Sequence, residues 1–111
     1  IKKEAEMQNH QLGRIQKQIE GIKKELQKIG EMRPGSLSRQ NVSQNGKKYP
    51  YYQISYTYNM KSRTDYIKKE FVADLKQQID NYRRFKKLVK RWVDLAMRHS
   101  KLKVDIVSKK M

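Results

Sequence analysis

Apolar residues recur at spacings of three and four over residues 1–32, which is the spacing of one face of a helix. They keep a coiled-coil heptad pattern with one polar member: Ile1, Ala5, Gln8, Leu12, Ile15, Ile19, Ile22, Leu26 and Ile29. So narrow a seam needs a partner helix to be stable in water. The pattern ends at Arg33-Pro34-Gly35, because proline lacks a backbone donor and disfavours helix at the preceding residue. We expect one coiled-coil-like helix over residues 1–32.

The period changes to two in residues 33–67, the second predicted part. Tyr52, Ile54, Tyr56 and Tyr58 alternate with polar residues, as in a half-buried strand. Asn59-Met60-Lys61 is a turn candidate, and residues 62–67 form a further strand. Asn45-Gly46 favours a hairpin that pairs residues 37–42 with 49–58, although Pro50 argues against ladder bonding where the central strand begins. The pattern predicts a two- or three-stranded antiparallel meander.

Helical spacing returns in residues 68–111, where one stripe runs from residue 68 to 106 with a candidate break at His99 and Ser100. Its members are Phe71, Leu75, Ile79, Tyr82, Phe85, Val89, Trp92, Ala96, Leu102 and Ile106. The two helical stripes are suitable partners for each other, within one chain or between chains. We therefore predict an α+β fold: an antiparallel, coiled-coil-like pair of long helices flanking the small meander, in one structural unit.

The net charge of the chain limits the classes of partner that it is expected to bind. The 111 residues hold 27 Lys and Arg against 11 Asp and Glu, a net charge of +16. Residues 68–111 alone carry net +9, compared with +5 for residues 33–67 and +2 for residues 1–32. So large a positive charge indicates a polyanionic partner: nucleic acid, an anionic membrane or an acidic protein.

The strongest local signal is the segment YRRFKKLVKRW at residues 82–92. On a helix its cations fall within an arc of roughly 160°, and Phe85, Leu88, Val89 and Trp92 fall within roughly 100° on the opposite side. Like charges four residues apart cost stability, which argues against a merely solvated face. We therefore expect phosphate binding by Arg83, Arg84, Lys86, Lys87, Lys90 and Arg91.

The meander offers a second, weaker contact. Lys47, Lys48, Lys61 and Arg63 lie beside tyrosines that could stack on unpaired bases. Since a small sheet buries one face, we expect Tyr52, Tyr56 and Tyr58 to pack inward and Tyr51 and Thr57 to be exposed. Residues 36–39, ending in Arg39, fit a phosphate site and a plain turn equally well.

Other classes have little support. No run is long enough to span a membrane, the first residues show no secretory signal, and there is no cysteine. His10 and His99 are isolated, and the carboxylates form no evident catalytic set. We expect no metal, no cofactor, no membrane partner and no enzymatic activity, and a cytoplasmic location.

Four motifs in order carry a resemblance: MRPGSLS at residues 32–38, YYQISY at 51–56, KSRT at 61–64 and NYRRFKKL at 81–88. They resemble a family of small prokaryotic proteins of unknown function. Many relatives have a Cys-rich, metal-knuckle-like insert before the PYY motif, which residues 40–48 lack. Some relatives accompany mobile elements, so the resemblance implies work on nucleic acid, and it brings no established activity.

Taken together, the sequence predicts a nucleic-acid-binding protein in a prokaryotic cell, accessory to a larger DNA or RNA complex, with DNA slightly favoured. The seam of residues 12–29 is a candidate for homo-oligomer formation. The alternative is a coiled-coil assembly or adaptor subunit that docks an acidic protein.

Overall fold

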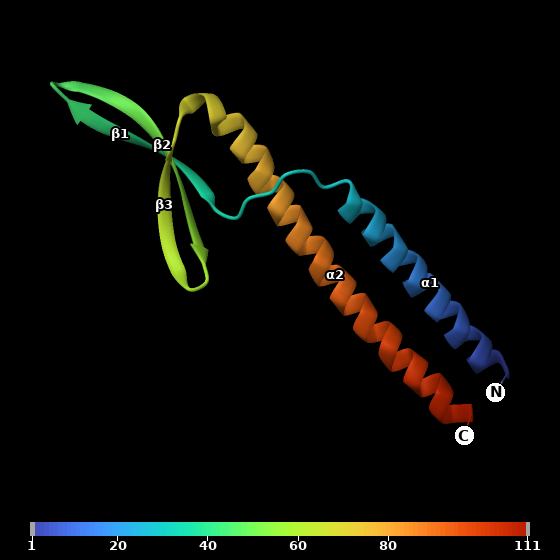
Figure 1. Cartoon of the computed structure of the whole chain (residues 1–111). Coiled ribbons are helices and arrows are strands. Elements are labelled where there is room, and N and C mark those ends of the chain that lie inside the picture. The colour runs from blue at the N-terminus through green and yellow to red at the C-terminus, as the bar shows by residue number, and fades with distance from the viewer. Residues whose placement is uncertain (1, 111) are drawn as a thin grey trace. The chain divides into compact units, whose positions relative to one another are not determined.

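The computed structural model describes residues 2–110, so Ile1 of the predicted seam lies outside the described residues. It contains two long helices and three strands (Figure 1): α1 Lys2–Gln27, β1 Ser36–Gln44, β2 Lys47–Tyr58, β3 Lys61–Ile67, a short 3₁₀ helix η1 Lys69–Phe71, and α2 Val72–Lys110. The predicted α+β class is confirmed. The chain divides into a helical unit, residues 1–29 with 85–111, and a sheet unit, residues 30–84.

The core of the helical unit is the predicted seam of α1 packed on the C-terminal half of α2. Ile15, Ile19 and Ile22 are buried in one cluster with Leu95. Half-buried apolar side chains extend this cluster along both helices: Leu26, Leu88, Trp92 and Leu102. The two helices run antiparallel (Figure 1), and the Lys23 ammonium lies 5.4 Å from the centre of the Trp92 ring. The seam therefore finds its partner helix within the same chain.

Helix α1 ends at Gln27, five residues before the predicted limit at residue 32. Its last turn is closed by shorter, i to i−3 bonds: the Lys28 amide donates to Glu25 at 3.1 Å, and the Ile29 amide donates to Leu26 at 3.2 Å. Residues beyond this turn are held by one side-chain and one backbone hydrogen bond from residues 78–81 of α2 instead. The Asn81 amide donates to the Glu31 carbonyl at 2.8 Å, and the Arg33 amide donates to the Gln78 carbonyl at 3.1 Å.

Helix α2 is continuous through His99 and Ser100, so the predicted break is wrong. The predicted stripe also needs correcting at Phe71, which is exposed within η1, and at Ala96, which is exposed, whereas the neighbouring Leu95 is buried. The reason is geometric. The side of α2 that meets α1 carries Leu88, Leu95 and Leu102, which are seven residues apart and therefore stay in line with a partner helix.

The sheet has the order β1-β2-β3, with both neighbouring pairs antiparallel. Both hairpin turns have two residues with positive φ: Asn45 (52°) with Gly46 (76°), and Asn59 (51°) with Met60 (64°). Positive φ at both positions is typical of the type I′ turn, which matches the twist of the flanking strands. The predicted meander is confirmed in its three-stranded form, and its strands are longer than predicted.

Pro50 lies inside β2, opposite Asn41, contrary to the expectation that ladder pairing would start after it. Gln44 and Lys47 close the two-residue turn as a hydrogen-bonded pair, and such pairs alternate along an antiparallel ladder. The Asn41–Pro50 pair is therefore a non-hydrogen-bonded one, at which the strand's amides point away from β1. Because β3 pairs with β2 only from Tyr52 onward, the missing amide of Pro50 costs no ladder bond.

The centre of the sheet unit is Ile54, whose side chain is completely buried. Gly35 has φ of 140° and packs directly on it. A Cβ atom at position 35 would lie 2.8 Å from Ile54 Cγ1 and 3.0 Å from the Ser55 carbonyl oxygen. Glycine is thus required here for its backbone conformation and for the close approach of β2.

Gly35→Ala is expected to lower the free energy of unfolding by at least about 2 kcal/mol, because it combines backbone strain with overpacking against Ile54. Gly21→Ala is the matched control: it lies within α1, where an added Cβ meets nothing within 4 Å. That control should stabilise the protein by about 0.5–1 kcal/mol through helix propensity. Urea unfolding followed by circular dichroism measures both. Equal effects of the two substitutions would contradict this role of Gly35.

Candidate nucleic-acid interface

All six cations predicted to bind phosphate on α2 have exposed side chains: Arg83, Arg84, Lys86, Lys87, Lys90 and Arg91. Phe85, Leu88, Val89 and Trp92, predicted for the opposite side of the helix, are all half-buried. The two-sided character of this segment is therefore confirmed. We call these six cations the α2 basic face.

Most charges of the α2 basic face are uncompensated. Among the described residues, no carboxylate lies within 4.0 Å of the side-chain nitrogens of Arg83, Lys87, Lys90 or Arg91. Positive side chains three or four residues apart on a helix repel each other when no negative group lies near them. Their arrangement is favourable electrostatically when an anion is bound along the helix.

The candidate cations of the sheet are divided between its two faces. In the strand register Arg39 lies opposite Tyr52, Arg63 opposite Tyr56 and Lys61 opposite Tyr58. Cross-strand partners share a face, so these three cations lie on the face of Ile54. Residue parity along β2 places Lys48 on that face too, and places Lys47 and Tyr51 on the other. The predicted second contact is thus not one continuous surface of the sheet.

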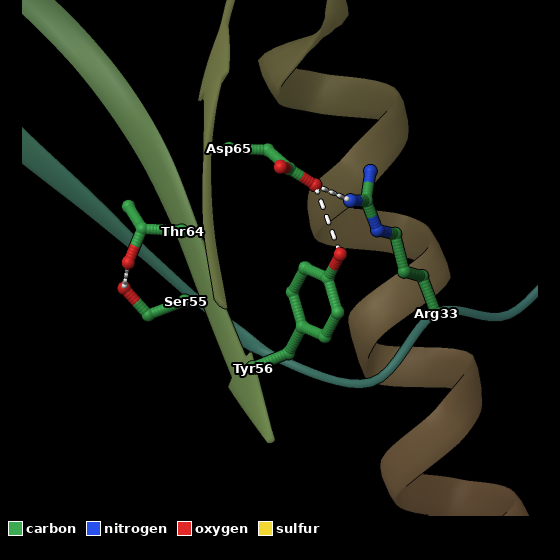
Figure 2. A network of polar contacts seen from close by, with 5 residues as sticks. All are labelled: Arg33, Ser55, Tyr56, Thr64 and Asp65. Atoms are coloured by element: carbon green, nitrogen blue, oxygen red, sulfur yellow. Dashed lines mark hydrogen bonds and ion pairs between the residues drawn. The ribbon is translucent and has the colours of Figure 1, made fainter. Parts of the chain in front are cut away.

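Tyr56 is engaged in a polar network on the Ile54 face. Its hydroxyl donates to Asp65 Oδ2 at 3.2 Å, and Arg33 donates to the same oxygen at 2.9 Å. The Arg33 guanidinium carbon also lies 5.4 Å from the centre of the Tyr56 ring. Figure 2 shows this network on one side of the strands and the Ser55–Thr64 hydroxyl pair, 3.3 Å apart, on the other. Tyr56 therefore has a structural role and is not a platform for a base.

Exposure of the other tyrosines departs from the prediction in two places. Tyr58 was expected to pack inward but is 67% exposed, because it lies at the end of β2 next to the turn. Tyr51 was expected to be exposed but is half-buried, with its ring centre 5.7 Å from that of Tyr66. Tyr66, at 80% exposure, leaves more ring surface for stacking than Tyr51 does.

The segment of residues 36–39 forms the start of β1 and is not a turn. Ser36 pairs with Ser55 and Ser38 pairs with Gln53, so the backbone of this segment belongs to the ladder. The amides of Ser36 and Ser38 are therefore used in pairing with β2 and are not available to a phosphate. Arg39 keeps an exposed side chain and remains a predicted phosphate contact.

The sequence patterns did not single out a second apolar face on α2. Val89, Trp92, Val93, Ala96, Met97 and Ser100 line a shallow, mostly apolar hollow in the helical unit. Val93 and Met97 are 52% and 54% exposed. Val89, Trp92 and Ala96 belong to the predicted stripe, whereas Val93 and Met97 follow Val89 at spacings of four and extend the apolar surface to a further side of the helix.

A group of basic side chains was also missed. Arg14 from α1 and Arg98 and Lys101 from α2 line one groove between these helices in the helical unit. Arg14 precedes the other two by more than eighty residues in the sequence. Only the antiparallel packing of α1 on α2 therefore brings the three side chains together. The charge tally by segment gave no signal for this convergence.

In the part of the chain that the structure describes, no helix is long and apolar enough to cross a membrane. Likewise, residues 2–110 contain no cluster of three or more His, Asp or Glu side chains that could hold a metal ion.

Residues 12–77 match the model of a protein family whose description is a domain of unknown function, DUF6788. No curated protein and no solved structure matches the chain. The matched range includes the first three motifs of the resemblance, whereas the fourth, at residues 81–88, follows its end. The link to mobile elements stays a prediction.

Asp65→Asn is expected to lower the free energy of unfolding by up to about 1 kcal/mol, because Tyr56 and Arg33 lose their shared charged acceptor at a partly exposed site. Thermal unfolding measures the change. Asp94→Asn makes the same change at an exposed position in the middle of α2, where no Lys or Arg nitrogen of the described residues lies within 4.0 Å of the carboxylate, and it is expected to have little effect. A drop in stability for Asp94→Asn as large as that for Asp65→Asn would contradict the network's role.

Proposed function

Since this chain belongs to the DUF6788 family, whose description names no activity, we propose its function from its own chemistry: it is a non-enzymatic protein that binds the phosphate backbone of a nucleic acid. It acts as an accessory to a larger DNA or RNA complex. DNA is slightly favoured, through the mobile-element association of the proteins that its motifs resemble.

The observation that carries this proposal is the uncompensated charge of four members of the α2 basic face: Arg83, Lys87, Lys90 and Arg91. Guanidinium groups suit phosphate oxygens because their donors form a planar fork, and ammonium groups add point charges. Six cations within about two and a half turns of one helix match a polymer with regularly repeated negative charge better than a single small anion. Contacts of this kind bind with little sequence preference.

The sheet supplies a second, separate set of contacts in this proposal. Arg39, Lys48, Lys61 and Arg63 on the Ile54 face would bind phosphates, and Lys47 would do so from the other face. Tyr51, with its partner Tyr66, would stack on unpaired bases when the nucleic acid is single-stranded.

Binding to nucleic acid should depend steeply on salt. With about four to six phosphate contacts, raising salt from 50 to 200 mM is expected to weaken binding to a duplex roughly 100- to 1,000-fold. Fluorescence anisotropy with duplex and single-stranded oligonucleotides across a salt series measures this slope. A flat salt response would contradict the proposal.

Charge reversal locates the contact. Replacing Arg83, Lys87 and Arg91 by Glu is expected to abolish measurable binding at 100 mM salt, because each change removes a phosphate contact and adds repulsion. The matched control replaces Lys3, Lys17 and Lys24 of α1 by Glu, with the same change in net charge. The proposal fails if both triple variants lose affinity equally. Circular dichroism verifies that each variant is folded.

One observation favours the alternative, an adaptor that docks an acidic protein. The apolar hollow around Val93 and Met97 lies on a helix whose other apolar side is already covered by α1. By helical spacing, Lys86, Lys90 and Lys101 lie along one edge of this hollow. Its chemistry therefore fits an amphipathic helix with acidic flanks better than a second copy of this strongly basic chain.

Self-association is a separate question. The seam of residues 12–29 is covered by α2 of the same chain, so a homo-oligomer formed through it would have to exchange α2 between chains. Such an exchange would bury the same side chains as the monomer does.

A designed helix of three heptads, with Leu at the seam positions and Glu on the flanks, tests the alternative. It is expected to bind the protein in a calorimetric titration, and Met97→Glu should weaken binding roughly tenfold or more by placing a charge in the contact. Met7→Glu on α1 is the control, since Met7 is exposed outside the hollow. Absence of binding, or equal loss in both variants, excludes this docking site.

A further inference from the structure

The groove that contains Arg14, Arg98 and Lys101 is built entirely within the helical unit, between α1 and the C-terminal half of α2, which lie side by side in Figure 1. Its volume is about 520 Å³, which is within the range of small-molecule sites. Gln11 and Gln18 complete its polar lining on α1, and Asp105 does so on α2. Ile15 and Leu102, from the apolar core, also line it.

The groove has an excess of positive charge, with three cations against the single carboxylate of Asp105. Among the described residues, none of these cations has a carboxylate within 4.0 Å of its side-chain nitrogens, and neither glutamine amide has a hydrogen-bond partner. The donors of this groove are therefore all available to a ligand.

We propose that this groove binds a phosphate group. Arg14 and Arg98 approach it from different helices, so one phosphate between them receives forked donors from two directions. Lys101 adds a point charge, and Gln11 and Gln18 donate neutral hydrogen bonds. The apolar side chains of Ile15 and Leu102 beside these donors lower the local dielectric constant, which strengthens the attraction between the cations and the anion.

The phosphate can belong to a nucleic-acid backbone or to a free phosphate ester, and position favours the first source. Lys101 lies fourteen residues after Lys87 and therefore on the same side of α2. At ~1.5 Å per residue the two are about 21 Å apart, within the reach of a few nucleotides of one strand. If the ligand is a nucleic-acid backbone, the inference rests on the proposed function. One strand would then contact both the α2 basic face and the groove.

The test uses the whole chain with inorganic phosphate, followed by NMR chemical shifts at constant ionic strength, and with a 12-nucleotide single strand, followed by fluorescence anisotropy. Arg14→Gln and Arg98→Gln are each expected to weaken phosphate binding about 3- to 10-fold. Asp105→Asn should strengthen it by a similar factor, because it removes the one opposing charge. Lys17→Gln is the matched control, since Lys17 is an exposed α1 cation outside the groove lining.

Opposite signs for the Arg and Asp variants, with both probes, support the inference and identify a nucleic-acid phosphate as the ligand. The same pattern with inorganic phosphate alone supports the groove and assigns it to a free phosphate ester. If Arg14→Gln, Arg98→Gln and Asp105→Asn all behave like Lys17→Gln, the inference is overturned. Oligonucleotide binding that is then lost only on charge reversal of the α2 basic face would leave the proposed function intact.

Discussion

The antiparallel packing of α1 on α2 is the constraint from which the functional surfaces follow. Burial of Ile15, Ile19 and Ile22 against Leu95 fixes which side of α2 faces inward. Once that side is assigned, the α2 basic face must point to solvent, and the Val93–Met97 side is left uncovered on a third side of the helix. The same packing brings Arg14 to Arg98 and Lys101. Every surface proposed to bind a ligand in the helical unit is thus a consequence of one apolar seam.

The packing of the sheet unit depends on one residue that has no side chain. Gly35 allows β2 to approach closely enough for Ile54 to be fully buried. Around this centre, Asp65 holds Arg33 and Tyr56, and Asn81 holds the backbone at Glu31. Arg33 and Gly35 of the MRPGSLS motif therefore have structural roles. The cations of the sheet lie on its two edge strands and beside its turns.

Local periodicity predicted most of the fold. The seam of α1, the meander with its Asn-Gly turn and the long second helix all follow from spacing and turn chemistry. The features that periodicity did not predict depend on contacts between elements far apart in the sequence. Leu95 displaces Ala96 from the core because the partner helix lies along one particular line of α2, and Pro50 fits within β2 because β3 is too short to reach it. The groove of Arg14 and Arg98 was beyond sequence reasoning, because residues far apart meet there only after the helices pack.

The central claim is that α2 presents a phosphate-binding side, and residue-by-residue mapping tests it most directly. Backbone NMR chemical shifts of the whole chain are followed while a 12-nucleotide strand is added at low salt. We expect the shifts to concentrate at residues 83–91 and to continue to the lining of the groove, while the amides of Val93 and Met97 change little. Binding that leaves the amides of residues 83–91 unchanged would contradict the claim, and so would the absence of any shift.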